Sequence, residues 1–280
     1  MPGMDRVDPA AEVEPVLRRS AGEGESVRAS RSWWDDQAAD YYEEHGAFLG
    51  DQDFLWGPEG VREGTAGLLG PVRGRRILEI GCGAAQCSRW LAGQGASPVA
   101  TDLSGGQLAQ AARLNRRTGV AVPLLQADAQ ALPFADESFD LVYSSQVLEH
   151  VLDPGNHLRE IARVLRHGGI LIGSTSQLEP YHSMSYWNIT PFGFVSLARA
   201  AGLEVRELRP GIDGITLTLR AFLGRPPGFD AWWQHESPLN AEIDAWGRST
   251  GRRAALVNLR KLHMCGQYAF MATRAVTESD

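Results

Sequence analysis

Residues 77–91, ILEIGCGAAQCSRWL, join an apolar run to a helical pattern through two closely spaced glycines. The apolar run at 76–80 predicts a β-strand, and the spacing of apolar residues over 85–94 predicts a helix. Gly81 and Gly83 tolerate positive φ and let the backbone approach a ligand closely. A helix that starts just after them offers unpaired N–H groups to an anion. The stretch therefore predicts a ligand-binding turn between a strand and a helix.

Apolar runs and helical patterns alternate along the next hundred residues. Further apolar runs occupy 98–102, 121–126, 139–145 and 170–176, and helical patterns occupy 105–118 and 157–169. Such alternation requires right-handed crossovers and gives a parallel sheet with helices on both faces. Ligands of these folds bind at the carboxyl ends of the strands.

Three acidic side chains fall at three successive strand ends: Glu79, Asp102 and Asp128. A buried carboxylate such as Glu79 requires a hydrogen-bonded or cationic partner. Asp102 is about twenty residues after the glycines, where a carboxylate accepts both hydroxyls of a ribose, and Asp128 can accept from an exocyclic amino group. Because Gln86 occupies the third glycine position of G-x-G-x-x-G, a nicotinamide cofactor is disfavoured. The ligand so described resembles S-adenosylmethionine, whereas the structural alternative for each acid is a helix cap or a surface ion pair.

Residues 75–175 resemble the class I S-adenosylmethionine-dependent methyltransferases, in the small-molecule group that includes the ubiquinone-pathway O-methyltransferases. Four stretches carry the resemblance: LEIGCGAA, ATDLS, LLQADAQALPFADESFDLVYSSQVLEHV and EIARVLRHGGILIGSTS. The resemblance implies an α/β fold with a doubly wound, seven-stranded, mostly parallel sheet, whose antiparallel last strand is GQYAFMATR. Ala85 departs from the pattern, which often has a third glycine there.

The resemblance also implies S-adenosylmethionine as the cofactor and assigns its contacts. The methionine part is bordered by Glu79, Gly81 and Gly83; ribose and adenine are held by Asp102 and Leu103, and adenine also by Asp128 and Ala129; the sulfonium lies beside Ser145 and Gln146.

An acceptor hydroxyl benefits from a general base, whereas an amine needs only to be neutral. His182 and His150 are the candidate bases, with His182 preferred because it lies in the segment that varies with the acceptor. His150 has a structural alternative, because its dipeptide occurs across the resembling family. Glu149 and His150 also resemble the Glu-x-x-Glu-His stretch of metal-dependent relatives, but Gln146 is a poor ligand for a hard cation, so no metal is expected.

The segment after residue 174 combines aromatic rings with polar tips, as a pocket for one orienting hydroxyl or amine requires. Its candidate acceptor contacts are Tyr181, Tyr186, Trp187 and Asn188. The alternative is that these aromatic residues only pack the loop and that His182 faces solvent.

The chain divides into five expected parts. These are a disordered tail at 1–28, an aromatic helical lid at 29–70 with Tyr42 as a cofactor contact, a cofactor-binding core at 71–210, a helical insertion at 211–262 and a final strand with its tail at 263–280. The alternative to a lid is a helix docked on the core, and the insertion forms either a substrate cap or a dimer surface.

Composition limits the partners. The net charge is −7 and no apolar run approaches bilayer length, so neither a nucleic-acid partner nor a membrane span is expected. Three cysteines and no export signal predict free thiols in the cytoplasm. The prediction is O-methylation of a small-molecule acceptor. The alternatives are N-methylation of an amine, a protein that binds the cofactor without methylating, and, less favoured, a protein or RNA methyltransferase.

Overall fold

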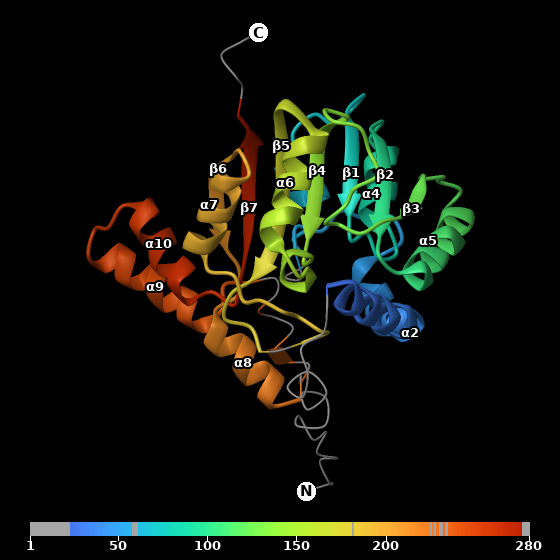
Figure 1. Cartoon of the computed structure of the whole chain (residues 1–280). Helices are drawn as coiled ribbons and strands as arrows, with labels where there is room; N and C mark the ends of the chain where they lie inside the picture. Colours follow the sequence, from blue (N-terminus) through green and yellow to red (C-terminus); the bar gives the residue numbers. More distant parts are fainter. Residues whose placement is uncertain are drawn as a thin grey trace, which may run out of the picture.

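The computed structural model describes residues 23–57, 61–180, 182–224, 226, 228, 229, 232 and 235–275. Its strands form a single sheet in the order β3-β2-β1-β4-β5-β7-β6, in which only β7 pairs antiparallel to its neighbours (Figure 1). The strands are β1 (Arg76–Ile80), β2 (Ser97–Asp102), β3 (Leu124–Gln126), β4 (Phe139–Ser145), β5 (Leu165–Ser176), β6 (Leu203–Pro210) and β7 (Gln267–Arg274). The predicted fold class and the antiparallel last strand are confirmed.

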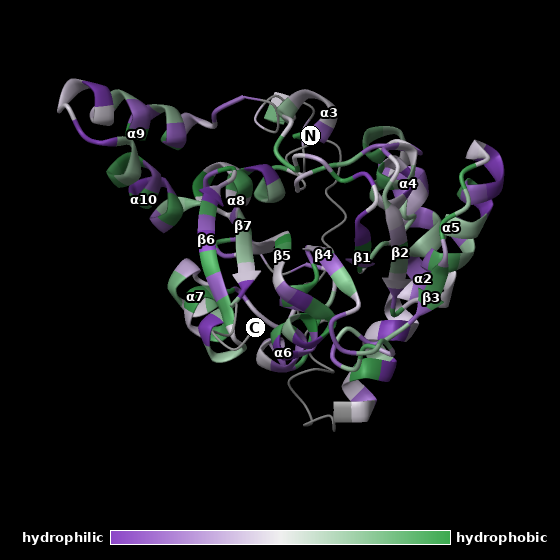
Figure 2. Ribbon diagram, turned by 90° about the horizontal axis from the view of Figure 1, so that it is seen from above, coloured by the Kyte–Doolittle hydropathy of each residue, from purple (hydrophilic) through white to green (hydrophobic). Residues whose placement is uncertain are grey.

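Helices cover both faces of this sheet (Figure 2). They are α2 (Glu23–Leu49), α3 (Glu63–Ala66), α4 (Gln86–Gly93), α5 (Gly105–Thr118), the short 3₁₀ helix η1 (Leu148–His150), α6 (Pro154–Val164), α7 (Pro191–Ala200), α8 (Gly214–Phe222), α9 (Pro238–Ser249) and α10 (Ala254–Met264). None of the helices in the described ranges is long and apolar enough to cross a lipid bilayer.

Two apolar layers hold the sheet between the helices. On one face α6 and α7 pack against β1, β4, β5 and β7, through side chains such as Ile161 and Phe194. On the other face α4 packs through Leu91 against Ile77 of β1 and Leu141 of β4. Side chains along a central strand therefore point alternately into the two apolar layers. The polar side chains of such a strand lie at its carboxyl end.

Several element boundaries differ from the sequence prediction. The largest difference is at Leu165, where β5 begins inside the helix expected over 157–169, so that α6 ends at Val164. The third strand begins at Leu124 rather than at residue 121, because Pro123 has no N–H to donate to a neighbouring strand, although its carbonyl accepts from Ala100. Helix α4 begins at Gln86, since Ala85 adopts φ +57°, the left-handed conformation that glycine tolerates better. The related pattern often has a glycine at that position, and this backbone gives the reason.

Helix α2 begins at Glu23, so the last six residues of the expected disordered tail are helical. The helix lies across the carboxyl ends of the strands, beside α5 (Figure 1). Asp35 joins the two helices, because its Oδ1 accepts from Ser104 Oγ at 2.7 Å and from the Gly106 amide at 2.9 Å. A Cβ at residue 106 would lie only 2.9 Å from the Asp35 carbonyl oxygen, so glycine permits this close approach.

The segment between β6 and β7 contains α8, α9 and α10, which matches the predicted helical insertion. It leaves the sheet edge and lies beside the carboxyl-end face in Figure 1. Lys261 joins α10 to α9 by bonding Asp244 at 3.0 Å. This insertion thus has its own internal contacts, and Leu262 of α10 joins it to the main apolar core.

Candidate functional site

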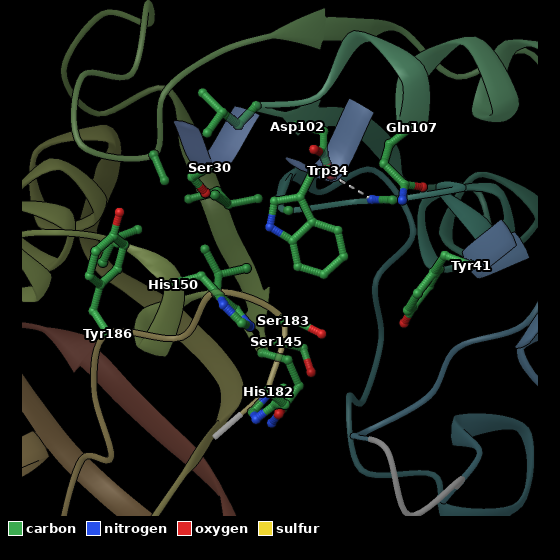
Figure 3. A pocket seen from close by; sticks show the side chains of 18 of the residues that line it. Ser30, Trp34, Tyr41, Asp102, Gln107, Ser145, His150, His182, Ser183 and Tyr186 are labelled. Atoms are coloured by element: carbon green, nitrogen blue, oxygen red, sulfur yellow. Dashed lines mark hydrogen bonds between the residues drawn. The ribbon is translucent and has the colours of Figure 1, made fainter. Parts of the chain in front are cut away.

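A cavity of about 700 Å³ opens at the carboxyl ends of β1, β2 and β4, beneath α2 (Figure 3). Its walls come from both the strand-end loops and helix α2. Eleven of the candidates chosen from sequence line it: Gly81, Gly83, Asp102, Leu103, Asp128, Ala129, Ser145, Gln146, His150, His182 and Tyr186. The strand-end positions and the loop histidines, which are far apart in the chain, therefore share one space.

Backbone geometry shapes the wall after β1. Gly81 adopts φ +67°, and a Cβ there would lie 2.3 Å from Val147 Cγ2, so the loop after β4 packs directly against the glycine. Asp102, at the end of β2, accepts from the Gly83 amide at 2.8 Å and from the Ser104 amide at 2.9 Å. Burial raises the pKa of the Asp102 carboxyl above its usual value, against the lowering effect of these bonds. The carboxyl group is thereby fixed at the cavity wall.

The adjoining wall follows β3 and β4. Asp128 is fixed by accepting from the Gln130 amide at 2.8 Å. Ser145 shares a hydrogen bond with Ser174 Oγ at 2.7 Å, and Gln146 Nε2 donates to the same oxygen at 3.0 Å. Gln146 also has φ +55°, a strained conformation for a side chain of its size. The turn after β4 is thus held rigidly from β5.

Glu79 lies outside the cavity lining. Its carboxylate accepts from the Ser88 amide at 2.9 Å and from Ser88 Oγ, so it holds the first turn of α4. Burial raises its pKa to about 7. The expected ligand contact of Glu79 is therefore replaced in this structure by the helix-cap alternative.

His150 faces the cavity from η1, with the Trp34 ring edge-on to its own at a centroid distance of 5.6 Å (Figure 3). Its Nδ1 is buried and has no hydrogen-bond partner. Burial and the neighbouring His182 lower the pKa of His150 to about 4. The ring is neutral at physiological pH and can accept a hydrogen bond from a ligand.

His182 lies next to His150, at a ring-centroid distance of 5.4 Å. Its Nδ1 is 3.1 Å from the Pro180 carbonyl oxygen, which accepts only an N–H, so Nδ1 carries the proton and Nε2 carries the lone pair in the neutral ring. Glu179 Oε1 lies 3.9 Å from the same Nδ1. This arrangement is the one that a general base acting through Nε2 requires.

Only one of the four residues predicted to contact the acceptor lines the cavity among the residues that the structure describes. Tyr186 lines the cavity, and its hydroxyl is 3.5 Å from the Ser26 carbonyl oxygen on α2. Trp187 and Asn188 are exposed and bond backbone carbonyls at Val151 and Glu179, so neither lines the cavity. Tyr181 lies outside the described residues.

Tyr42 also points away from the cavity. Its hydroxyl donates to Asp51 Oδ1 at 3.0 Å and accepts from Arg117 at 2.6 Å, which pins α2 to the end of α5. The cavity is lined instead by its neighbour Tyr41. The expectation that Tyr42 contacts the cofactor is thus not met by the geometry.

Sequence reasoning missed most of the α2 wall: Ser26, Val27, Ser30, Trp34, Tyr41, Glu44, His45 and Phe48. These positions recur at three-, four- and seven-residue intervals, so helical periodicity could have separated this face from Trp33 and Tyr42. Glu179, Gln267, Leu217 and Arg220 were also missed. They come from elements that meet only in the folded chain.

Glu149, His150 and His182 could together hold a cation, since their ligand atoms lie within 4.8 Å of one another. The Glu149 carboxylate is already bonded by Thr175 at 3.0 Å and by Ser176 at 3.1 Å. The absence of a metal remains a prediction from sequence.

A family model described as "Methyltransferase domain" matches residues 78–173. The ubiquinone biosynthesis O-methyltransferase of Ruegeria pomeroyi is 34% identical over 48% of this chain and 62% of its own. The demethylmenaquinone methyltransferase of Clavibacter sepedonicus is 36% identical over 49% of this chain and 54% of its own. The chain thus spans somewhat more than half the length of these relatives.

Solved structures agree with the fold. The [4+2]-cyclase SpnF has 27% identity and a TM-score of 0.50, over 73% of this chain and 76% of its own. A putative sarcosine dimethylglycine methyltransferase from Galdieria sulphuraria has 16% identity and a TM-score of 0.57, over 86% and 98% of the two chains. With the sheet order, these findings show that residues 78–173 form a methyltransferase domain and that the chain has the fold of S-adenosylmethionine-dependent methyltransferases.

Proposed function

We propose that the chain transfers a methyl group from S-adenosylmethionine to a hydroxyl of a small molecule, with His182 as the general base. The observation that carries this is the continuity of the cavity. Strand-end residues of the cofactor motifs and His182, whose Nδ1 faces the Pro180 carbonyl, line the same space. Its volume of about 700 Å³ falls within the 300–1,000 Å³ typical of small-molecule sites.

The residues present fit the cofactor of this family. Asp102 offers fixed carboxylate oxygens for vicinal hydroxyls, and the loop of Gly81 and Gly83 has no side chains that would fill the space beside it. Asp128 and Leu103 extend this wall. S-adenosylmethionine supplies a methyl group already activated by the positively charged sulfur. The protein's task is to align the acceptor, take its proton and exclude water.

Acceptor alignment is assigned to the opposite wall. Trp34 packs edge-on against His150, and Tyr186 lines the same side of the cavity; rings of this kind hold a flat, partly apolar molecule (Figure 3). An acceptor hydroxyl placed against His182 Nε2 would give up its proton to that nitrogen while its oxygen takes the methyl group, whose bond to the cofactor sulfur would break and leave the demethylated cofactor. The Ruegeria relative, a ubiquinone biosynthesis O-methyltransferase, supports a hydroxyl as the acceptor group.

The alternative with specific support is binding without methyl transfer. It is supported by the similarity to SpnF, which is a [4+2]-cyclase. N-methylation of an amine is the other alternative, and it would need no base. The acidic net charge of −7 speaks against a nucleic-acid acceptor.

Incubation with methyl-labelled S-adenosylmethionine and a panel of phenols, amines and a metabolite extract, followed by mass spectrometry, tests the proposal. O-methylation requires one labelled methyl group on a hydroxyl and one equivalent of the demethylated cofactor. A labelled amine would establish N-methylation. Converted acceptor without label would establish the non-methylating alternative.

A further inference from the structure

Three side chains next to His182 are joined by hydrogen bonds: Glu149, Ser176 and Glu179. Ser176 is the last residue of β5. Ser176 Oγ lies 2.5 Å from Glu179 Oε2 and 3.1 Å from Glu149 Oε1. A hydroxyl has one hydrogen to donate, and a carboxylate can only accept. The single Ser176 proton serves one carboxylate at a time, so both contacts are hydrogen bonds only if one of the two glutamates is protonated and donates to Ser176.

The surroundings decide which glutamate holds the proton. Glu149 is completely buried, and its Oε2 accepts from Thr175 Oγ1 at 3.0 Å. Glu179 is partly exposed at the cavity wall, and its Oε2 accepts a second bond from Gln267 Nε2 at 2.7 Å. Two donors on one oxygen favour the charged form at Glu179, whereas full burial favours the neutral form at Glu149. The hydrogens then run from Glu149 Oε1 to Ser176 Oγ and from Ser176 Oγ to Glu179 Oε2.

Titratable groups face Glu149 from several elements. His150 and His182 have ring nitrogens within 4.8 Å of its carboxyl group, and Tyr268 of β7 also lies near it; a charge on His182 acts to lower the pKa of Glu149. Burial raises the pKa of Glu149 to about 7, and the negative charge of Glu179 contributes in the same sense. His150 is neutral, since burial lowers its pKa to about 4, so it supplies no compensating cation.

We propose that Glu149, Ser176 and Glu179 form a positioning chain in which Glu149 keeps a proton, Ser176 passes a hydrogen bond on, and Glu179 keeps a negative charge beside His182. Glu179 Oε1, 3.9 Å from His182 Nδ1, stabilises the ring after it has taken a proton at Nε2. Pro180 fixes the orientation of the ring, and Glu179 supplies the charge. The catalytic part of this inference rests on the proposed role of His182 as the base.

The first test removes the charge of Glu179 and keeps its shape. We expect Glu179→Gln to lower kcat about 10- to 100-fold with unchanged cofactor affinity, because the protonated ring loses its counter-charge. The acid limb of the pH–rate profile should move to lower pH by about one unit. Ser176→Ala should show a smaller effect in the same direction, and Ser176→Thr, which retains the hydroxyl, should restore activity.

Two spectroscopic readouts test the chain without turnover. Infrared difference spectra below pH 7 should show a protonated carboxylic acid in the wild type that Glu149→Gln lacks. The His182 ring titration, followed by NMR, should move to lower pH in Glu179→Gln. If His182→Ala retains turnover, the proposed base is wrong. The two spectroscopic readouts would still show whether Glu149, Ser176 and Glu179 are arranged as proposed.

Either of two results would overturn the inference. One is the absence of the Glu149 acid band together with an unchanged His182 titration in Glu179→Gln. The other is loss of activity in a chelator with recovery on adding Zn²⁺, and Zn²⁺ binding that Glu149→Gln abolishes. That second result would assign Glu149, His150 and His182 to a bound cation instead.

Discussion

The two halves of the cavity are built in different ways. The half after β1, β2 and β3 comes from short consecutive stretches at strand ends, and backbone amides fix its Asp102 carboxyl. The half around His182 is assembled from α2, the loops after β4 and β5, and α8. The half around His182 should control kcat, and the strand-end half should control the affinity for the cofactor.

The largest effect is expected in the assembled half. His182→Ala should lower kcat about 10²- to 10⁴-fold, the range typical of a general base, and leave cofactor affinity unchanged. Steady-state kinetics and a binding titration measure the two quantities. His167→Ala, in a histidine bonded to Glu137 far from the cavity, is the matched control. Near wild-type turnover in the His182 variant would remove it as the base.

The next largest effect concerns how Glu149, next to His182, makes the stability of the fold depend on pH. The pKa of Glu149 rises from 4.5 to about 7 on folding. A raised carboxyl pKa stabilises the fold fully below pH 4.5, and the contribution is lost as pH rises through 7. The loss amounts to on the order of 3 kcal/mol. Thermal unfolding between pH 5 and 8 should therefore show a steeper fall in Tm for the wild type than for Glu149→Gln, and parallel curves would contradict the buried acid.

The strand-end half should control affinity. Asp102→Ala should weaken S-adenosylmethionine and its demethylated product about ten- to hundredfold, since hydrogen bonds to a charged group contribute ~1.5–3 kcal/mol. Calorimetry measures the change, and circular dichroism checks the fold. Glu79→Gln is the informative comparison, because Glu79 holds α4 and does not line the cavity. Equal losses in both variants would mean that Glu79 contacts the ligand after all.

The strand-end half could be predicted almost completely from sequence. Strands, helices and ligand side chains follow one another locally there, so periodicity and spacing were enough to place Gly81, Gly83, Asp102 and Asp128 on one wall. Glu79 was the exception, because sequence gives its strand-end position but not which way its carboxyl group points. In the structure it turns to Ser88.

The assembled half resisted prediction for a physical reason. Trp187 was chosen for its chemistry, yet its indole N–H bonds the Val151 carbonyl outside the cavity. Glu179 and Gln267 meet only because β7 pairs with β5 after an insertion of three helices. Contacts between residues so far apart leave no local pattern. On α2 the pattern existed, but density of aromatic residues favoured Tyr42 over the correct face at Tyr41.

The smallest effect is expected at the joint between the halves. Asp35→Ala removes the bonds from α2 to Ser104 and Gly106 and should loosen α2 by ~1 kcal/mol, which is about fivefold in the open population. Limited proteolysis with and without the demethylated cofactor measures this opening. Asp36→Ala, at an exposed neighbouring position, is the control. Equal cleavage of wild type and Asp35→Ala would show that α2 does not depend on this joint.

The most direct test of the two-half account follows the methyl group itself. NMR of S-adenosylmethionine carrying a ¹³C-methyl group would show whether that methyl lies at the boundary between the halves. The account predicts one bound methyl signal per chain, shifted by His182→Ala and unchanged by His167→Ala. No bound signal, or a bound signal that His182→Ala leaves in place, would contradict it.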